Sequence, residues 1–140
     1  MEMSTVRNRL NLVIDAAKRS SAARRARNDE AARSYERVLE FAVPLFKQMA
    51  QALKVSGYLF SVFTPGGSVK LMSDKSPEDY IELSLDTSGE DPAVMGHVSR
   101  ARGRRVIESE HPIANKVVAE LTEEDVFEFL LKEIEPFVER

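Results

Sequence analysis

Between Asn28 and Val55 the larger apolar residues recur at steps of three and four, which is the spacing of one face of an α-helix. They are Tyr35, Val38, Leu39, Ala42, Leu45, Phe46, Met49, Ala52 and Leu53. Because such a stripe is unstable in water, it needs a sheet, another helix or a second chain to cover it. The strands predicted further along the chain can supply that cover.

A second apolar stripe precedes it, and the spacing predicts a helix over residues 4–19 that Ser4 or Thr5 can cap. The stripe consists of Val6, Leu10, Val13, Ile14 and Ala17. From residue 20 to residue 33, alanine is the only apolar residue, which favours a helix by propensity but offers little to bury. Two shapes are consistent with this pattern. One is a single helix from about residue 5 to residue 55, roughly 75 Å long. The other is a helical pair that breaks near Ser20–Ser21 or at Asn28–Asp29.

Pro44 lies inside the longer stripe, where it removes one backbone hydrogen bond and crowds the preceding turn. We therefore expect a kink near residues 40–43 or a restart of the helix. Gly57 is the expected exit from the helix.

After Gly57 the apolar period changes from about 3.6 to 2, which is typical of strands. Strands are predicted over residues 58–64, 69–73, 80–86, 93–101 and 104–111. A turn at Arg102-Gly103 would place Val98 opposite Ile107, His97 opposite Glu108 and Arg100 opposite Arg105. The pattern indicates a five-stranded, mainly antiparallel meander.

The last helix has the clearest start. Thr122 can cap it, Asp125 can complete a capping box, and Leu121 and Val126 can form a hydrophobic staple. We expect Pro136 to end this helix or to kink its last turn. The chain is thus predicted to be α+β, with a long N-terminal helix or helical pair, the meander, and a C-terminal amphipathic helix. We divide it into an N-terminal helical extension, residues 1–28, and a single α+β domain, residues 29–140.

Composition narrows the class of protein. The chain has 140 residues, 43% hydrophobic and 31% charged, which is an ordinary globular balance, and it has no cysteine. It has no apolar run near the 20 residues that a membrane crossing needs, and its start does not resemble a signal peptide. We therefore expect a cytoplasmic protein without membrane attachment. The net charge of −3 hides an asymmetry, because residues 1–33 are basic and residues 120–140 are acidic.

Signals for chemistry are weak. The only histidines are His97 and His111, and the nearest acids, Glu108 and Glu110, do not complete a set of three or four converging metal ligands. The turn at residues 65–68 has no lysine in the frame that a phosphate-binding loop requires. We therefore predict no catalytic residue, no cofactor and no metal, and we do not expect an enzyme.

Two arginine clusters suggest one function. Guanidinium groups can neutralise phosphates, so these side chains are candidates for contact with an anion or a nucleic acid. They are Arg24, Arg25 and Arg27 in the N-terminal region and Arg100, Arg102, Arg104 and Arg105 around the hairpin tip. The acidic overall charge and the lack of interleaved aromatic residues weigh against this alternative.

The two apolar helix faces suggest a different function, which is protein–protein interaction. Two stripes exceed what a five-stranded sheet already covered by the C-terminal helix can bury, which favours self-association or docking onto another protein. We therefore expect a non-catalytic interaction or adaptor module that forms a homodimer through its N-terminal helices. The residues expected at the contact are Leu10, Val13, Ile14, Ala17, Tyr35 and Val38.

Overall fold

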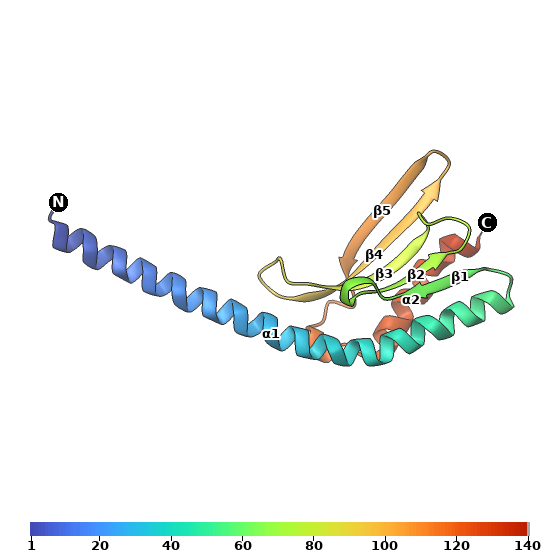
Figure 1. Ribbon diagram of the computed structural model, residues 1–140, viewed down its shortest axis with the longest axis horizontal. Coiled ribbons are helices and arrows are strands. Elements are labelled where there is room, and N and C mark those ends of the chain that lie inside the picture. Colours follow the sequence, from blue (N-terminus) through green and yellow to red (C-terminus); the bar gives the residue numbers. More distant parts are fainter. Residues whose placement is uncertain (140) are drawn as a thin grey trace.

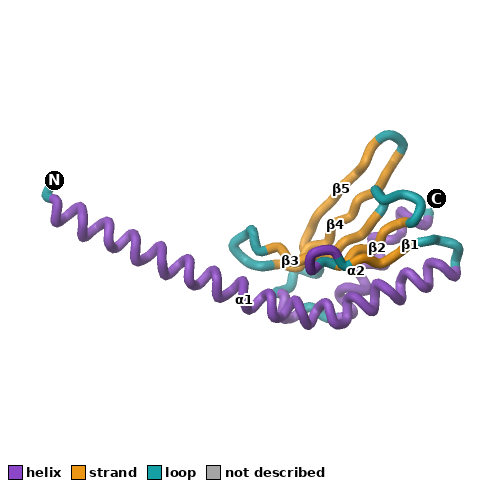
Figure 2. Tube along the Cα trace, viewed as in Figure 1, coloured by secondary structure: helices purple, strands orange, loops and turns teal. Residues whose placement is uncertain are grey.

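A long helix, a five-stranded sheet and a second helix make up the protein (Figure 1). The structure is a computed structural model, and it describes residues 1–139. Helix α1 (Met3–Val55) is followed by β1 (Phe60–Phe63), β2 (Val69–Ser73), β3 (Tyr80–Asp86), β4 (Ala93–Arg102), β5 (Arg105–Pro112) and α2 (Glu123–Val138). Short 3₁₀ turns lie at Pro65–Gly67 and Val118–Glu120. Figure 2 shows the same arrangement coloured by type of element.

The sheet is a meander in which each strand pairs antiparallel with the next along the chain. The predicted α+β class and its order of elements are confirmed. The strand ends differ slightly from the prediction, because β1 is shorter than residues 58–64 and β4 extends to Arg102. Side chains alternate between the two faces of each strand. The buried apolar positions of β2, β3 and β4 form one face of the sheet, whereas no residue of β5 is buried.

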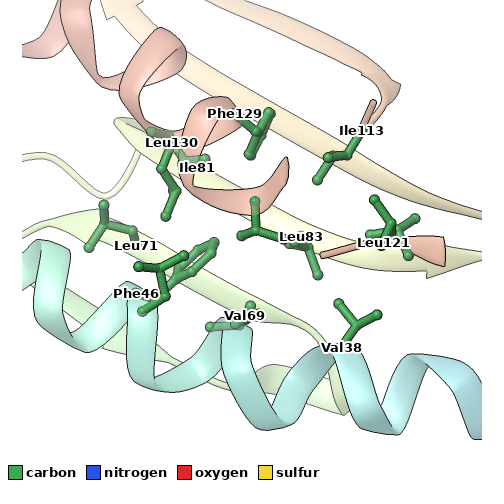
Figure 3. Close-up of a cluster of buried hydrophobic side chains, with 14 of the residues drawn as sticks. Val38, Phe46, Val69, Leu71, Ile81, Leu83, Ile113, Leu121, Phe129 and Leu130 are labelled. Atoms are coloured by element: carbon green, nitrogen blue, oxygen red, sulfur yellow. The ribbon is translucent and has the colours of Figure 1, made fainter. Parts of the chain in front are cut away.

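The core lies between this face and the two helices (Figure 3). Val38 and Phe46 of α1 lie against Val69 and Leu71 of β2, and Phe129 and Leu130 of α2 close the cluster from the other side. The second half of α1 therefore has the sheet as its cover, as its apolar stripe required. The opposite face of the sheet carries partly exposed side chains, among them Lys70, Glu82 and His97.

Helix α1 is continuous from Met3 to Val55, so the alternative of a helical pair broken at Ser20–Ser21 or Asn28–Asp29 is wrong. The N-cap is Glu2, whereas Ser4 and Thr5 lie inside the helix. Alanine and arginine, which both have high helix propensity, make up most of residues 20–33, and this favours continuation of the helix through Asn28 and Asp29. The helix does not restart at Pro44, since α1 continues through this residue to Val55. Figure 1 shows that α1 is curved, with the sheet on its concave side.

The end of α1 follows the prediction. Gly57 has a φ of 91°, and its N–H donates to the Lys54 carbonyl, while the Tyr58 N–H donates to the Leu53 carbonyl at 2.8 Å. This pair of hydrogen bonds satisfies carbonyls that the last helical turn leaves free, and only glycine adopts the left-handed conformation without strain.

The β4–β5 turn differs from the prediction by one position. The turn residues are Gly103 and Arg104, and Arg102 pairs with Arg105. His97 consequently lies opposite Glu110, Val98 opposite Ser109 and Arg100 opposite Ile107. Gly103 takes a φ of 63°, and glycine at the first central position is what a tight hairpin turn of this kind requires.

The start of α2 is as predicted. The Asp125 N–H donates to the Thr122 hydroxyl at 3.2 Å, and the Thr122 N–H donates to the Asp125 carboxylate at 3.0 Å. Lys116 Nζ contacts the same carboxylate at 2.9 Å, and hydrogen bonding from this ammonium lowers the pKa of Asp125. Pro136 does not end the helix, which continues to Val138.

Candidate interaction surface

The first half of α1 projects from the rest of the molecule as a free helix (Figure 1). Residues 3–27, called the arm below, are all exposed, and the first core residue of the helix is Ala31. The globular part, residues 31–139, therefore begins about halfway along α1. Since the second half of α1 is fixed by the core, the arm extends a helix that is already nucleated.

Apolar side chains on the arm are exposed to solvent. Leu10 is 53% exposed, Val13 65% and Ile14 39%, and Met3 and Val6 are also exposed. Together with Ala17 these side chains form the arm stripe: Met3, Val6, Leu10, Val13, Ile14 and Ala17. Leu12 is 70% exposed, but it lies off the stripe because residues two apart in a helix point about 200° apart. A row of apolar side chains on one face of a projecting helix is a surface suited to a protein partner.

Tyr35 and Val38 do not belong to this surface. Val38 is completely buried, and the Tyr35 hydroxyl lies 2.8 Å from the Gly67 carbonyl and 3.3 Å from the Leu83 carbonyl, to which it donates. Burial, with a smaller effect of Glu82, raises the pKa of Tyr35. Both side chains are used by the core of their own chain, so the expectation that they contact a second copy is corrected. Sequence spacing alone did not distinguish the two stripes.

The arm stripe points to the same side of α1 as the core stripe. Val13 and Ala31 are 18 residues apart, as are Ala17 and Tyr35, and 18 residues are five full helical turns. Figure 1 shows the sheet and α2 on the concave side of the curved helix. Any partner of the arm stripe must therefore approach from the side on which the globular part sits.

The two arginine clusters lie far apart. Arg27 lines a cavity together with Ala93, the first residue of β4, whereas Arg102 is the last residue of that strand. Ten strand residues span roughly 30 Å, so the fold does not merge the clusters into one basic patch. Arg24, Arg25 and Arg27 on the arm and Arg102, Arg104 and Arg105 at the tip are exposed, and Arg100 is half-buried.

The two histidines also do not meet. His97 lies on the open face of the sheet, 3.6 Å from Glu108 (Nε2 to Oε1) and edge-on to Tyr80. His111 lies on the helix side, 3.4 Å from Glu133 (Nε2 to Oε1) and edge-on to Phe129. Within residues 1–139 no three His, Asp or Glu side chains are grouped as metal ligands.

Two cavities lie beside the arginine clusters, one at each cluster. One of about 610 Å³ lies at the base of the arm, and the other, of about 450 Å³, lies beside Arg100, Arg102 and Glu139 at the hairpin tip. The larger is lined by Arg27, Glu30, Ala31, Ser34, Asp91, Pro92, Ala93, Pro112, Asn115, Lys116, Val117, Val118 and Ala119. Neither contains His97 or His111.

No protein-family model, curated protein or solved structure matches this chain. The helices of residues 1–139 include none with the length and apolarity that a membrane crossing requires.

Proposed function

We propose that this protein is a non-catalytic interaction module of the cytoplasm that forms a homodimer through its arm. The observation that carries the proposal is the exposed arm stripe, in which Leu10 and Val13 are each more than half accessible on a helix that already exists. Burying side chains of this size is favourable by about 1.5–3 kcal/mol each. Association does not bear the cost of nucleating the helix, because the core holds its second half.

A second copy is the partner that the arm stripe suits best. The stripe is apolar along one side, with Arg7, Arg9 and Lys18 beside it, so a second identical stripe offers the matching apolar surface. A contact of this kind is isologous, since the same residues contribute from both chains.

Absolute mass by light scattering on a sizing column tests the proposal. The wild-type chain is expected to have the mass of a dimer, and Leu10→Glu with Ile14→Glu is expected to give a folded monomer, because both charges fall within the buried contact. Leu12→Glu is the matched control. It adds one negative charge between the two substituted positions but off the stripe, and it should leave the mass unchanged. A monomeric wild type, or a double variant that keeps the wild-type mass, would exclude the proposal.

The second candidate function is nucleic-acid binding by the exposed arginines. It is supported by the segment from Lys18 to Arg27, which carries five cations and no acid on a free helix. Such binding should weaken steeply with salt. Replacing Arg24, Arg25 and Arg27 with glutamine should reduce the retardation of DNA or RNA at low salt, and replacing Arg102, Arg104 and Arg105 tests the tip separately. Absence of retardation by the wild type at low salt would remove this candidate.

A further inference from the structure

We infer that the two copies pair antiparallel over residues 3–17, with Leu10 of one copy beside the partner's Leu10. This inference rests on the proposed self-association and specifies its geometry. Three features of the arm carry it: where the apolar spacing ends, where the globular part sits, and how the cations are distributed.

The apolar spacing sets the extent of the contact. Met3, Val6, Leu10, Val13 and Ala17 follow one another at steps of three and four, as in the contact positions of a two-helix coiled coil. The next positions in the same series are Ser20 and Arg24. A polar residue and then a cation end the seam, so the self-complementary surface has its centre at Leu10.

The position of the globular part excludes a parallel pair in register. The arm stripe and the core stripe face the same side of α1, and the sheet with α2 fills that side from Ala31 onward (Figure 1). Two parallel helices that brought their stripes together would place both globular parts in the same space between them. In an antiparallel pair the globular parts lie at opposite ends. The partner's Met3 then reaches only as far as Ala17, well short of Ala31.

The cations favour the same orientation. Lys18, Arg19, Arg24, Arg25 and Arg27 lie directly after the seam with no acid among them. A parallel pair would hold ten cations side by side along about three turns of each helix, at separations where like charges repel even in salt. In the antiparallel pair these segments lie at opposite ends, beyond the overlap.

The geometry predicts an elongated dimer. In this register Met3 lies beside the partner's Ala17 and Val6 beside the partner's Ile14. The overlap is roughly 22 Å long, and the two Ala31 residues, where the globular parts begin, are roughly 60 Å apart at a rise of 1.5 Å per residue.

Cysteine cross-linking tests the orientation in the full chain, which contains no native cysteine. Met3→Cys and Ala17→Cys are prepared separately, with one copy carrying a tag so that mixed pairs separate on a gel. The antiparallel pair predicts little disulfide in either variant alone and a mixed disulfide when the two are combined, at the fraction expected from random pairing. Leu12→Cys, which lies off the seam, measures background collisional oxidation.

The outcomes separate the orientation from the self-association itself. A dimeric mass with disulfides of Met3→Cys to itself and of Ala17→Cys to itself indicates a parallel pair and overturns the inference while the proposed function stands. A dimeric mass with no disulfide above the Leu12→Cys background places the contact elsewhere and also overturns it. A monomeric mass overturns the proposed function and the inference with it.

Discussion

The two halves of α1 have the same pattern and opposite surroundings. Residues 31–53 bury Tyr35, Val38 and Phe46 against the sheet, whereas the arm leaves Leu10, Val13 and Ile14 in solvent. Each half is amphipathic, and both apolar stripes point to one side of the helix. The comparison shows that an apolar stripe predicts that a helix face is to be buried. It does not predict whether the same chain or a second chain buries it.

The difference arises from the length of the helix. The sheet and α2 can cover only the part of α1 that passes over them, and the remaining turns extend beyond their edge (Figures 1 and 2). The uncovered stripe is thereby available to a second molecule, and substitutions in the two halves should have contrasting effects.

The largest contrast is expected between Phe46→Ala and Leu10→Ala. Phe46 is completely buried, so its removal leaves a cavity and should lower the free energy of unfolding by about 3–5 kcal/mol. Leu10→Ala should change it by less than about 0.5 kcal/mol, because the side chain is exposed within the monomer. Urea unfolding measures both changes in free energy, at protein concentrations low enough to keep the chain monomeric. Equal losses in the two variants would show that the arm packs on its own globular part.

A smaller contrast concerns the hydroxyl of Tyr35. Tyr35→Phe removes the hydrogen bonds to the Gly67 and Leu83 carbonyls and should lower the free energy of unfolding by about 1 kcal/mol. Leu12→Ala is the comparison on the arm. It removes more atoms from an exposed position and should have almost no effect. The same urea titration measures both, and a Tyr35→Phe variant as stable as the wild type would contradict the anchoring role of this hydroxyl.

The smallest effect is expected from removing residues 1–28. The arm buries nothing in the monomer, and Asp29 is a suitable residue to begin the shortened helix. The free energy of unfolding of the shortened chain should stay within about 0.5 kcal/mol of the monomeric full chain. Thermal or urea unfolding measures this difference. A loss of several kcal/mol would assign the arm a structural role within its own chain.

Local chemistry was readable from the sequence at several points. Alternating Ile81, Leu83 and Leu85 identified β3, Thr122 and Asp125 marked the start of α2, and Gly57 marked the end of α1. These signals act within a few residues, through side-chain alternation, capping hydrogen bonds and a backbone conformation suited to glycine. The β4–β5 turn was predicted one position too early, which shifts every predicted pair by two residues, because glycine can occupy either central position of a short turn.

Part of the candidate surface was readable as well. The exposed residues Leu10, Val13, Ile14 and Ala17 were identified from their helical spacing, and Tyr35 and Val38 were wrongly grouped with them. All six have the same spacing, so no local rule separates them. Their burial depends on whether the sheet lies beneath that turn of the helix.

The packing of α2 on the sheet shows the same limit. The Phe129 ring lies in the space that a Cβ at position 96 would occupy, so a larger residue there would force this ring to move. Nothing within either segment predicts that Gly96 and Phe129 meet. The periodicities along the chain specify helices and strands because they depend on neighbours a few residues away. Tertiary structure decides which stripe is covered, which glycine lies against a ring and which surface remains for a partner. These outcomes depend on residues that are distant in the chain and meet only in the folded protein.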